Sequence, residues 1–277
     1  MGFLKSYFKY HAYILYNGYR KILLRTDKST FAFLFNLKSL LIGSSARLSW
    51  SGESFIVTDK QLPDFKYKVR HQQQCNYAYE FGAIKRAEKL AKFYFLNEIE
   101  FSDNDILLDC GANVGDLKIW FELHNKNINY IGFEPSPIEF KCLKYNVSPS
   151  EVHEVGLWNQ AGELEFFLSS QQAVSSLIEP RNYDEKIIAK VTKLEHYVTT
   201  PIKLLKLEAE GAEPEILEGL GDKIKLVKFI SADLGYERGI DCESTLVPVT
   251  NYLLKRGFEI INVSHGRICA LYKNKNL

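Results

Sequence analysis

The chain has 277 residues, of which 46% are hydrophobic and 25% are charged, a composition typical of a soluble globular protein with one large domain or two modest ones. Its formal net charge of +1 argues against a surface built to neutralise phosphates, so we expect no nucleic-acid partner. The five cysteines form no C-x-x-C pair and have no histidine at metal-ligand spacing, which indicates reduced thiols in a cytoplasmic protein. No apolar stretch reaches the roughly 20 residues that a membrane-spanning helix needs.

Positive charge is concentrated near the N-terminus. The first 50 residues hold eight basic side chains and one acidic one, giving +7, so the remainder is −6. Residues 3–24 interleave aromatic and apolar residues with lysines and arginines, a pattern that is compatible with an amphipathic helix lying on an anionic membrane. The alternative is a helix packed on the main domain or on a second subunit of a homo-oligomer. The first interpretation places the protein peripherally at the inner face of the membrane.

We divide the chain near residue 100. Residues 1–100 form an N-terminal accessory region with helical and mixed structure. Its expected elements are a short hairpin of residues 55–57 and 65–69, connected through Pro63 and Asp64, and a helix over residues 77–96.

Residues 101–277 alternate between strand and helix patterns, which predicts an α/β domain with a doubly wound, mostly parallel sheet. Alternation in residues 162–168 predicts an antiparallel hairpin, and a polar loop follows over residues 169–184. The last two strands read as a closing antiparallel pair. The expected strands are residues 106–109, 130–134, 151–157, 202–207, 226–232, 258–263 and 267–272, and the expected helices are 116–123, 137–145, 213–220 and 245–256.

A glycine-rich turn joins the first strand of this domain to a helix. Backbone amides at such a helix start can receive a carboxylate, and a downstream acid can accept hydrogen bonds from the two hydroxyls of a ribose. The turn lacks the third glycine of a dinucleotide fingerprint and has no Gly-Lys-Ser/Thr, which disfavours a pyrophosphate cradle. The alternative is that the downstream Glu134 only caps a helix. The predicted cofactor site comprises Asp109, Gly111, Ala112, Asn113, Gly115, Glu134 and Pro135.

These motifs occur with others in a fixed order: LLDCGANVGD, IGFEPSP, EVGLWNQAGELEF, VSSL and LLKLEAEGAEPEILEGL. Over about residues 100–260 the chain resembles the FkbM family of S-adenosylmethionine-dependent methyltransferases. The resemblance implies a class I methyltransferase fold with S-adenosylmethionine as cofactor. It also implies that Asp109, Gly111, Asn113 and Gly115 line the methionine side and that Glu134 holds the ribose. The family usually has aspartate where this chain has Glu208.

Acidic residues follow the later strands at the edge where a doubly wound sheet binds its ligands. Glu208 and Glu210 follow residues 202–207, and Asp233 follows residues 226–232. Methyl transfer to a hydroxyl needs a base, and neighbouring acids raise the pKa of a carboxylate toward that role. We predict Glu210 as the base, with Glu208 or Asp233 orienting it.

Other roles for these acids stay open. Glu208 and Glu210 could bind a divalent metal, although no metal is indicated. Glu210 could instead cap the following helix or pair with Lys206. His265 is a further candidate base.

The polar loop and the helix before residue 100 carry aromatic and basic side chains that suit sugar rings and phosphates. Alternatively, the aromatic side chains pack in the core and the basic ones are ordinary solvated surface charges. The predicted activity is O-methylation of a sugar hydroxyl on a nucleotide-linked, lipid-linked or surface glycan. The alternatives are O-methylation of a small natural product, an NAD-dependent oxidoreductase and a non-catalytic nucleotide-binding protein. The residues concerned are Ser175, Ser176, Arg181 and Tyr183 in the loop, and Tyr77, Tyr79 and Arg86 in the helix.

Overall fold

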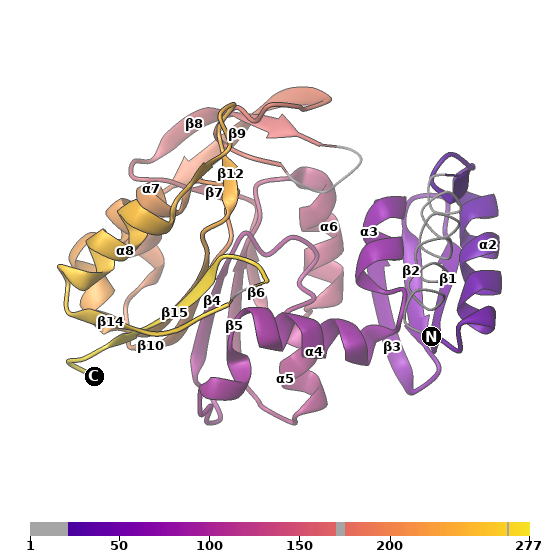
Figure 1. The fold of residues 1–277 in the computed structure, drawn as a ribbon, viewed down its shortest axis with the longest axis horizontal. Coiled ribbons are helices and arrows are strands. Elements are labelled where there is room, and N and C mark those ends of the chain that lie inside the picture. The colour runs from indigo at the N-terminus through magenta and orange to yellow at the C-terminus, as the bar shows by residue number, and fades with distance from the viewer. Residues whose placement is uncertain (1–21, 170–174, 265) are drawn as a thin grey trace, which may run out of the picture. The chain divides into compact units, whose positions relative to one another are not determined.

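The computed structural model describes residues 22–169, 175–264 and 266–277, which belong to two compact units, Met1–Gly82 and Ala83–Leu277 (Figure 1). The sequence pattern places the division near residue 100. The structure places α4 (Ala83–Phe93) in the second unit, because this helix packs on α5 (Lys118–Leu123). Nearly all of the basic arm over residues 3–24 lies outside the described residues.

The first unit contains a three-stranded antiparallel sheet in the order β1-β2-β3, with α2 packed on β1. The side chain of Asp27 caps α2 by accepting hydrogen bonds from the Ser29 and Thr30 N–H groups at 3.0 and 3.1 Å. Phe31 and Phe35 of α2 are fully buried. The elements are α2 (Lys28–Leu41), β1 (Ala46–Trp50), β2 (Phe55–Asp59), β3 (Leu62–Val69) and α3 (Gln72–Ala78).

Two predictions for this region need correction. The expected hairpin is present as β2 and β3, but the strands are longer, and Pro63 and Asp64 lie within β3 rather than in the turn. The single helix expected over residues 77–96 is two helices, because the chain leaves α3 and adopts a left-handed backbone at Gly82 (φ +98°) before α4 begins. A helix cannot continue through that conformation.

The second unit is built on a seven-stranded sheet in the order β14-β15-β11-β10-β4-β5-β6. All neighbouring pairs from β11 to β6 are parallel, whereas β15 runs antiparallel between β11 and β14. This confirms the predicted doubly wound, mostly parallel sheet with an antiparallel final strand. The strands are β4 (Ile106–Cys110), β5 (Asn129–Phe133), β6 (Glu151–His153), β10 (Ile202–Leu207), β11 (Val227–Asp233), β14 (Phe258–Val263) and β15 (Cys269–Asn274).

Helices cover both faces of this sheet. In Figure 1, α7 (Glu213–Leu220) and α8 (Leu246–Leu254) lie on one side, and α4, α5 and α6 (Pro137–Asn146) lie on the other. The central strands are apolar and buried, as a sheet covered on both faces requires. Short 3₁₀ turns connect several elements: η1 (Leu96–Glu98), η2 (Leu194–Tyr197) and η3 (Gly221–Leu226). In the described part of the chain, no helix has the length and apolar character needed to cross a bilayer.

A second sheet, in the order β7-β9-β8, corrects two further predictions. The strand expected over residues 151–157 is divided into β6 and β7 (Gly156–Leu157), which belong to different sheets. The strand β8 (Gly162–Leu168) does not form a local hairpin. It pairs antiparallel with β9 (Glu185–Thr192), which follows the predicted polar loop in a segment to which the sequence analysis assigned no element. A small ribbon of β12 (Tyr236–Arg238) and β13 (Glu243–Ser244) completes the unit.

Candidate active site

The turn that follows β4 lies against two neighbouring strands. The N–H groups of Gly111 and Ala112 both donate to the Phe133 carbonyl at the end of β5, at 3.1 and 2.9 Å. Gly111 has φ +74°, and a Cβ added to it would lie 1.8 Å from the Glu208 carbonyl oxygen. Because the neighbouring atom is backbone, only glycine fits at this position. The turn after β4 and the segment after β10 are therefore in direct contact.

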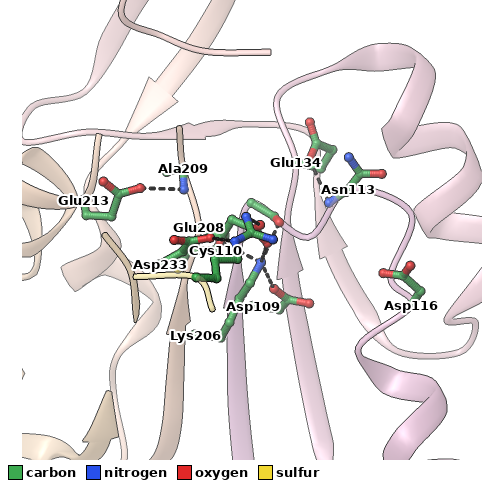
Figure 2. A network of polar contacts seen from close by, with 12 residues as sticks. Asp109, Cys110, Asn113, Asp116, Glu134, Lys206, Glu208, Ala209, Glu213 and Asp233 are labelled. Atoms are coloured by element: carbon green, nitrogen blue, oxygen red, sulfur yellow. Dashed lines mark hydrogen bonds and ion pairs between the residues drawn. The ribbon is translucent and has the colours of Figure 1, made fainter. Parts of the chain in front are cut away.

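Glu134 directly follows β5 and faces this turn (Figure 2). Its Oε2 accepts a hydrogen bond from the Asn113 N–H at 2.8 Å, and its Oε1 accepts one from the Ser136 N–H at 2.9 Å. Burial, reinforced by the nearby Glu139, raises the pKa of Glu134 to about 8. The structure thus brings together the glycine-rich turn and the strand-end acid. The second bond also orders the start of α6, as the capping alternative expects.

The remaining cofactor-site residues differ in their surroundings. A Cβ on Gly115 would lie 2.4 Å from Val147 Cγ1 and 2.8 Å from Leu143 Cδ1, so this glycine allows the turn to pack on α6. Ala112 is buried next to Gly111, and Pro135 precedes the start of α6.

Asp109 is the penultimate residue of β4, and its carboxylate is buried below the turn. Its Oδ2 accepts a hydrogen bond from the Tyr130 hydroxyl at 2.7 Å, and its Oδ1 lies 2.9 Å from Lys206 Nζ. Lys206 also donates to the Gly111 carbonyl at 2.8 Å. Burial acts to lower the pKa of Lys206, but Asp109 and Glu208 raise it above its ordinary value. The ion pair of Asp109 and Lys206 thus fixes the position of the turn, because Lys206 is also bonded to the Gly111 carbonyl.

A cluster of acids lies at the carboxyl ends of β10 and β11, around one arginine. Arg267, just before β15, contacts Glu208 through Nη2 and Asp233 through Nε, and Lys206 Nζ lies 3.3 Å from Glu208 Oε2. Burial acts to raise the pKa of Glu208, but Lys206 and Arg267 lower it to about 2. Burial raises the pKa of Asp233, and Arg267 opposes that effect. Glu208 and Asp233 share Arg267, and Glu208 is also paired with Lys206.

Glu210 has a different environment. Its backbone is left-handed (φ +51°), and its carbonyl oxygen accepts a hydrogen bond from Ser176 Oγ at 3.0 Å. Its Oε2 is buried and has no hydrogen-bond partner within residues 22–169, 175–264 and 266–277. Burial, together with Glu237 and Glu208, raises the pKa of Glu210 well above its usual range. Of the three predicted catalytic acids, Glu210 and Asp233 have raised pKa values, and Glu210 differs from Asp233 in that it forms no ion pair within the described residues.

Two functional candidates escaped the sequence analysis. The cap position of α7 is Ala212, so Glu210 does not cap this helix. Glu213, the first residue of α7, holds the turn before the helix, because its Oε1 accepts hydrogen bonds from the N–H groups of Ala209 and Gly211 at 2.8 and 3.3 Å. Its Oε2 accepts another from Thr245 Oγ1 at 3.0 Å. The second glutamate of the E-G-A-E run was the available signal. No sequence motif marks Arg267 as a functional residue, because its contacts arise from the order of the strands in the sheet.

The predicted ion pair between Lys206 and Glu210 is also wrong, because Lys206 is paired with Asp109 and Glu208 instead. Within the described residues, no group of three or more histidine, cysteine or acidic side chains is arranged to hold a metal ion. The candidate base His265 lies outside the described residues.

The predicted acceptor residues are dispersed. Ser176 is placed at the acid cluster by its bond to Glu210. Arg181 donates from Nε to the Ile240 carbonyl at 3.2 Å, and the Tyr183 ring packs edge-on against Phe167 at 4.9 Å between centroids. Arg86 of α4 forms an ion pair with Asp116 at 2.6 Å. Tyr77 and Tyr79 belong to the first unit, whereas Ser175 has its Oγ 3.1 Å from the Ser169 N–H.

Comparison with known proteins gives one family match and more distant likenesses. The model of the "Methyltransferase FkbM domain" matches residues 109–260, more than half of the chain. A curated relative, "Methyltransferase 1" of Beauveria bassiana (strain ARSEF 2860), is 24% identical over 152 residues, covering 44% of this chain and 61% of the relative. The chain thus spans less than two thirds of that relative's length.

Two solved structures illustrate the structural likenesses. A SAM-dependent methyltransferase from Aquifex aeolicus has a TM-score of 0.40 and 11% identity, over 70% of this chain and 98% of that one. The N-terminal domain of human METTL16 in complex with SAH has a TM-score of 0.39 and 13% identity, over 69% of each chain.

Proposed function

Because the chain belongs to the FkbM methyltransferase family, we propose that it transfers the methyl group of S-adenosylmethionine to a hydroxyl oxygen of a saccharide. The acceptor would be a nucleotide-linked, lipid-linked or surface glycan. The observation that carries the proposal is the contact between Glu134 and the turn after β4, which joins the two halves of an adenosyl site. S-adenosylmethionine supplies an electrophilic methyl group on its sulfonium.

The residues around the turn fit this cofactor by the chemistry of their donors and acceptors. Each oxygen of the Glu134 carboxylate accepts one backbone N–H, and an ionised carboxylate has about four acceptor sites. When Glu134 is ionised, capacity therefore remains for two ribose hydroxyls. The turn containing Gly111 and Asn113 would hold the methionine part, with Asp109 and Lys206 fixing the turn's position from below.

In the proposed reaction, the acceptor oxygen forms a bond to the methyl carbon while the carbon–sulfur bond breaks. The hydroxyl proton passes to a carboxylate, and the products are a methyl ether and S-adenosylhomocysteine. Glu210 is the proposed proton acceptor, because burial and neighbouring acids raise its pKa toward the working range of a general base. Glu208 is a poor base, since its two cation partners lower its pKa to about 2.

The test compares E210Q with E163Q, a control that changes an exposed glutamate on β8. Transfer of labelled methyl from S-adenosylmethionine is measured against nucleotide sugars, glycolipids and free oligosaccharides. S-adenosylhomocysteine affinity is measured by calorimetry. We expect E210Q to lose roughly 10²–10⁴-fold in kcat with little change in affinity, the range for loss of a general base. Retained turnover in E210Q eliminates Glu210 as the base.

The same screen separates the remaining alternatives. If the protein methylates small phenolic or alcoholic natural products and no saccharide, the proposed methyl transfer is correct but the proposed acceptor class is wrong. Cofactor affinity without turnover on any acceptor would indicate a non-catalytic binding protein. Affinity for NAD in place of S-adenosylhomocysteine would contradict the proposal as a whole.

A further inference from the structure

Arg267 occupies an unusual position in the second unit. It lies beyond residues 109–260, the part that matches the family model, and immediately before the antiparallel strand β15. Because β15 pairs with β11, this one guanidinium reaches carboxylates that follow two different parallel strands. Its Nη2 also lies 3.8 Å from Glu237 Oε1 on the β12 ribbon.

The charges that face one another here do not balance. The acids are Glu208 and Glu210 after β10, Glu213 on α7, Asp233 on β11, Glu237 on β12, and Asp109 on β4, and the nearby uncharged titratable groups are Tyr94 and Cys269. The cations that form ion pairs with this group are Lys206 and Arg267, and Arg86 of α4 also acts on Glu208. Six acids thus face three cations.

The ion-pair geometry decides which acids carry their charge. Lys206 is engaged by Asp109 and Glu208, and Arg267 is engaged most closely by Glu208 and Asp233. Glu210 and Glu237 are thereby left with the weakest compensation. Within the described residues Glu210 forms no ion pair, whereas Glu208 and Asp233 each contact Arg267.

We propose that Arg267 is a positioning residue that holds Glu208 and Asp233 in ion pairs, so that Glu210 and Glu237 form the pair that exchanges the acceptor's proton. This inference rests on the proposed function for its catalytic meaning. The charge division itself concerns only the side chains of this protein and can be measured without a methyl acceptor.

The electrostatic consequence has a definite sign. Burial, together with Asp233, raises the pKa of Glu237 to about 7, and Arg267 acts against that rise. A cation within 4–6 Å lowers a carboxyl pKa by roughly 1–3 units, so removing it makes the neighbouring acids harder to ionise. The pKa of Glu237 therefore rises when Arg267 is replaced by a neutral residue.

The experiment is a carbon-13 NMR titration of the full chain with labelled glutamate side-chain carboxyls, in which the signal absent from E237Q identifies Glu237. We expect a titration midpoint near 7 for the unmodified protein. In R267Q it should rise by on the order of one pH unit, and R267K should restore it, because a positive charge is retained. R256Q is the control, since Arg256 is exposed at the end of α8. It should leave the midpoint in place.

If circular dichroism shows that R267Q does not fold, D233N provides the test with the opposite sign. This change removes an acid next to Glu237 and frees Arg267, so the Glu237 midpoint should fall. A midpoint that stays in place in a folded R267Q, or in D233N where R267Q is unfolded, overturns the proposal. S-adenosylhomocysteine affinity, measured on the same samples, tests the proposed function separately.

Discussion

Replacing Gly111 by alanine tests the central contact of the candidate site, the approach of the turn after β4 to the segment after β10. Gly111 combines a left-handed backbone (φ +74°) with a carbonyl oxygen 1.8 Å from the position of an added Cβ. Gly239, in the same unit, has nearly the same backbone (φ +71°), but its added Cβ would meet only the Ile178 Cγ2 at 3.8 Å. G239A therefore reproduces the backbone strain without the overlap.

The magnitudes follow from these two contributions. A left-handed conformation costs a non-glycine residue about 1–2 kcal/mol, and both variants incur this cost. Overpacking in a filled region adds roughly 1–3 kcal/mol, and only G111A incurs it, because backbone atoms of Glu208 must move. We expect losses of about 2–5 kcal/mol for G111A and about 1–2 kcal/mol for G239A.

Thermal unfolding followed by circular dichroism measures the difference. One kcal/mol corresponds to roughly 2–4 °C in Tm for a domain of 150–250 residues. Calorimetric titration with S-adenosylhomocysteine should show weakened binding in G111A and not in G239A. Equal Tm values for the two variants would refute the inferred contact between the turn and Glu208.

Three further predictions concern separate features. The pKa of Glu134 rises from 4.5 to about 8 on folding, so its contribution to stability is present below pH 4.5 and is lost as pH rises through about 8. E134Q should flatten the fall of Tm between pH 5 and pH 8.5, and an unchanged slope would contradict the burial of this carboxyl. E213A should lower the free energy of unfolding by about 1–3 kcal/mol in urea titrations, because three hydrogen bonds lose their acceptor, whereas T245V, which removes one donor, should cost less. The basic N-terminal arm predicts co-sedimentation with phosphatidylserine vesicles, weakened by about 1 kcal/mol per charge in K5Q/K9Q; absence of sedimentation in the unmodified chain would exclude the membrane interpretation.

The sequence was sufficient to predict what depends on local pattern. The strand ending at Cys110, the helix Glu213–Leu220 and the pairing of the turn with Glu134 each follow from short motifs with a fixed spacing. The regular alternation of strand and helix patterns, followed by two adjacent strands, was also sufficient to predict the parallel sheet and its antiparallel end.

The features that the sequence did not predict depend on contacts between segments far apart in the chain, and local sequence patterns do not indicate such contacts. β9 pairs with β8 across a polar connection of 16 residues, and although its sequence, EKIIAKVT, has four apolar residues, nothing in it indicates which strand it pairs with. Arg267 gains its partners only because β15 lies next to β11. The sequence singled out Glu210 as a possible helix cap, whereas the side chain that bonds the turn before α7 is that of Glu213.

The place of β15 in the sheet has a consequence for how this protein is made. β15 follows β14 in the chain, yet it lies between β14 and β11, so β14 joins the sheet only through the strand synthesised after it. Arg267 arrives with the same strand. During translation, Glu208 and Asp233 therefore lack Arg267 until the residues just before β15 have left the ribosome, and a nascent chain that stops short of Arg267 carries an incomplete centre.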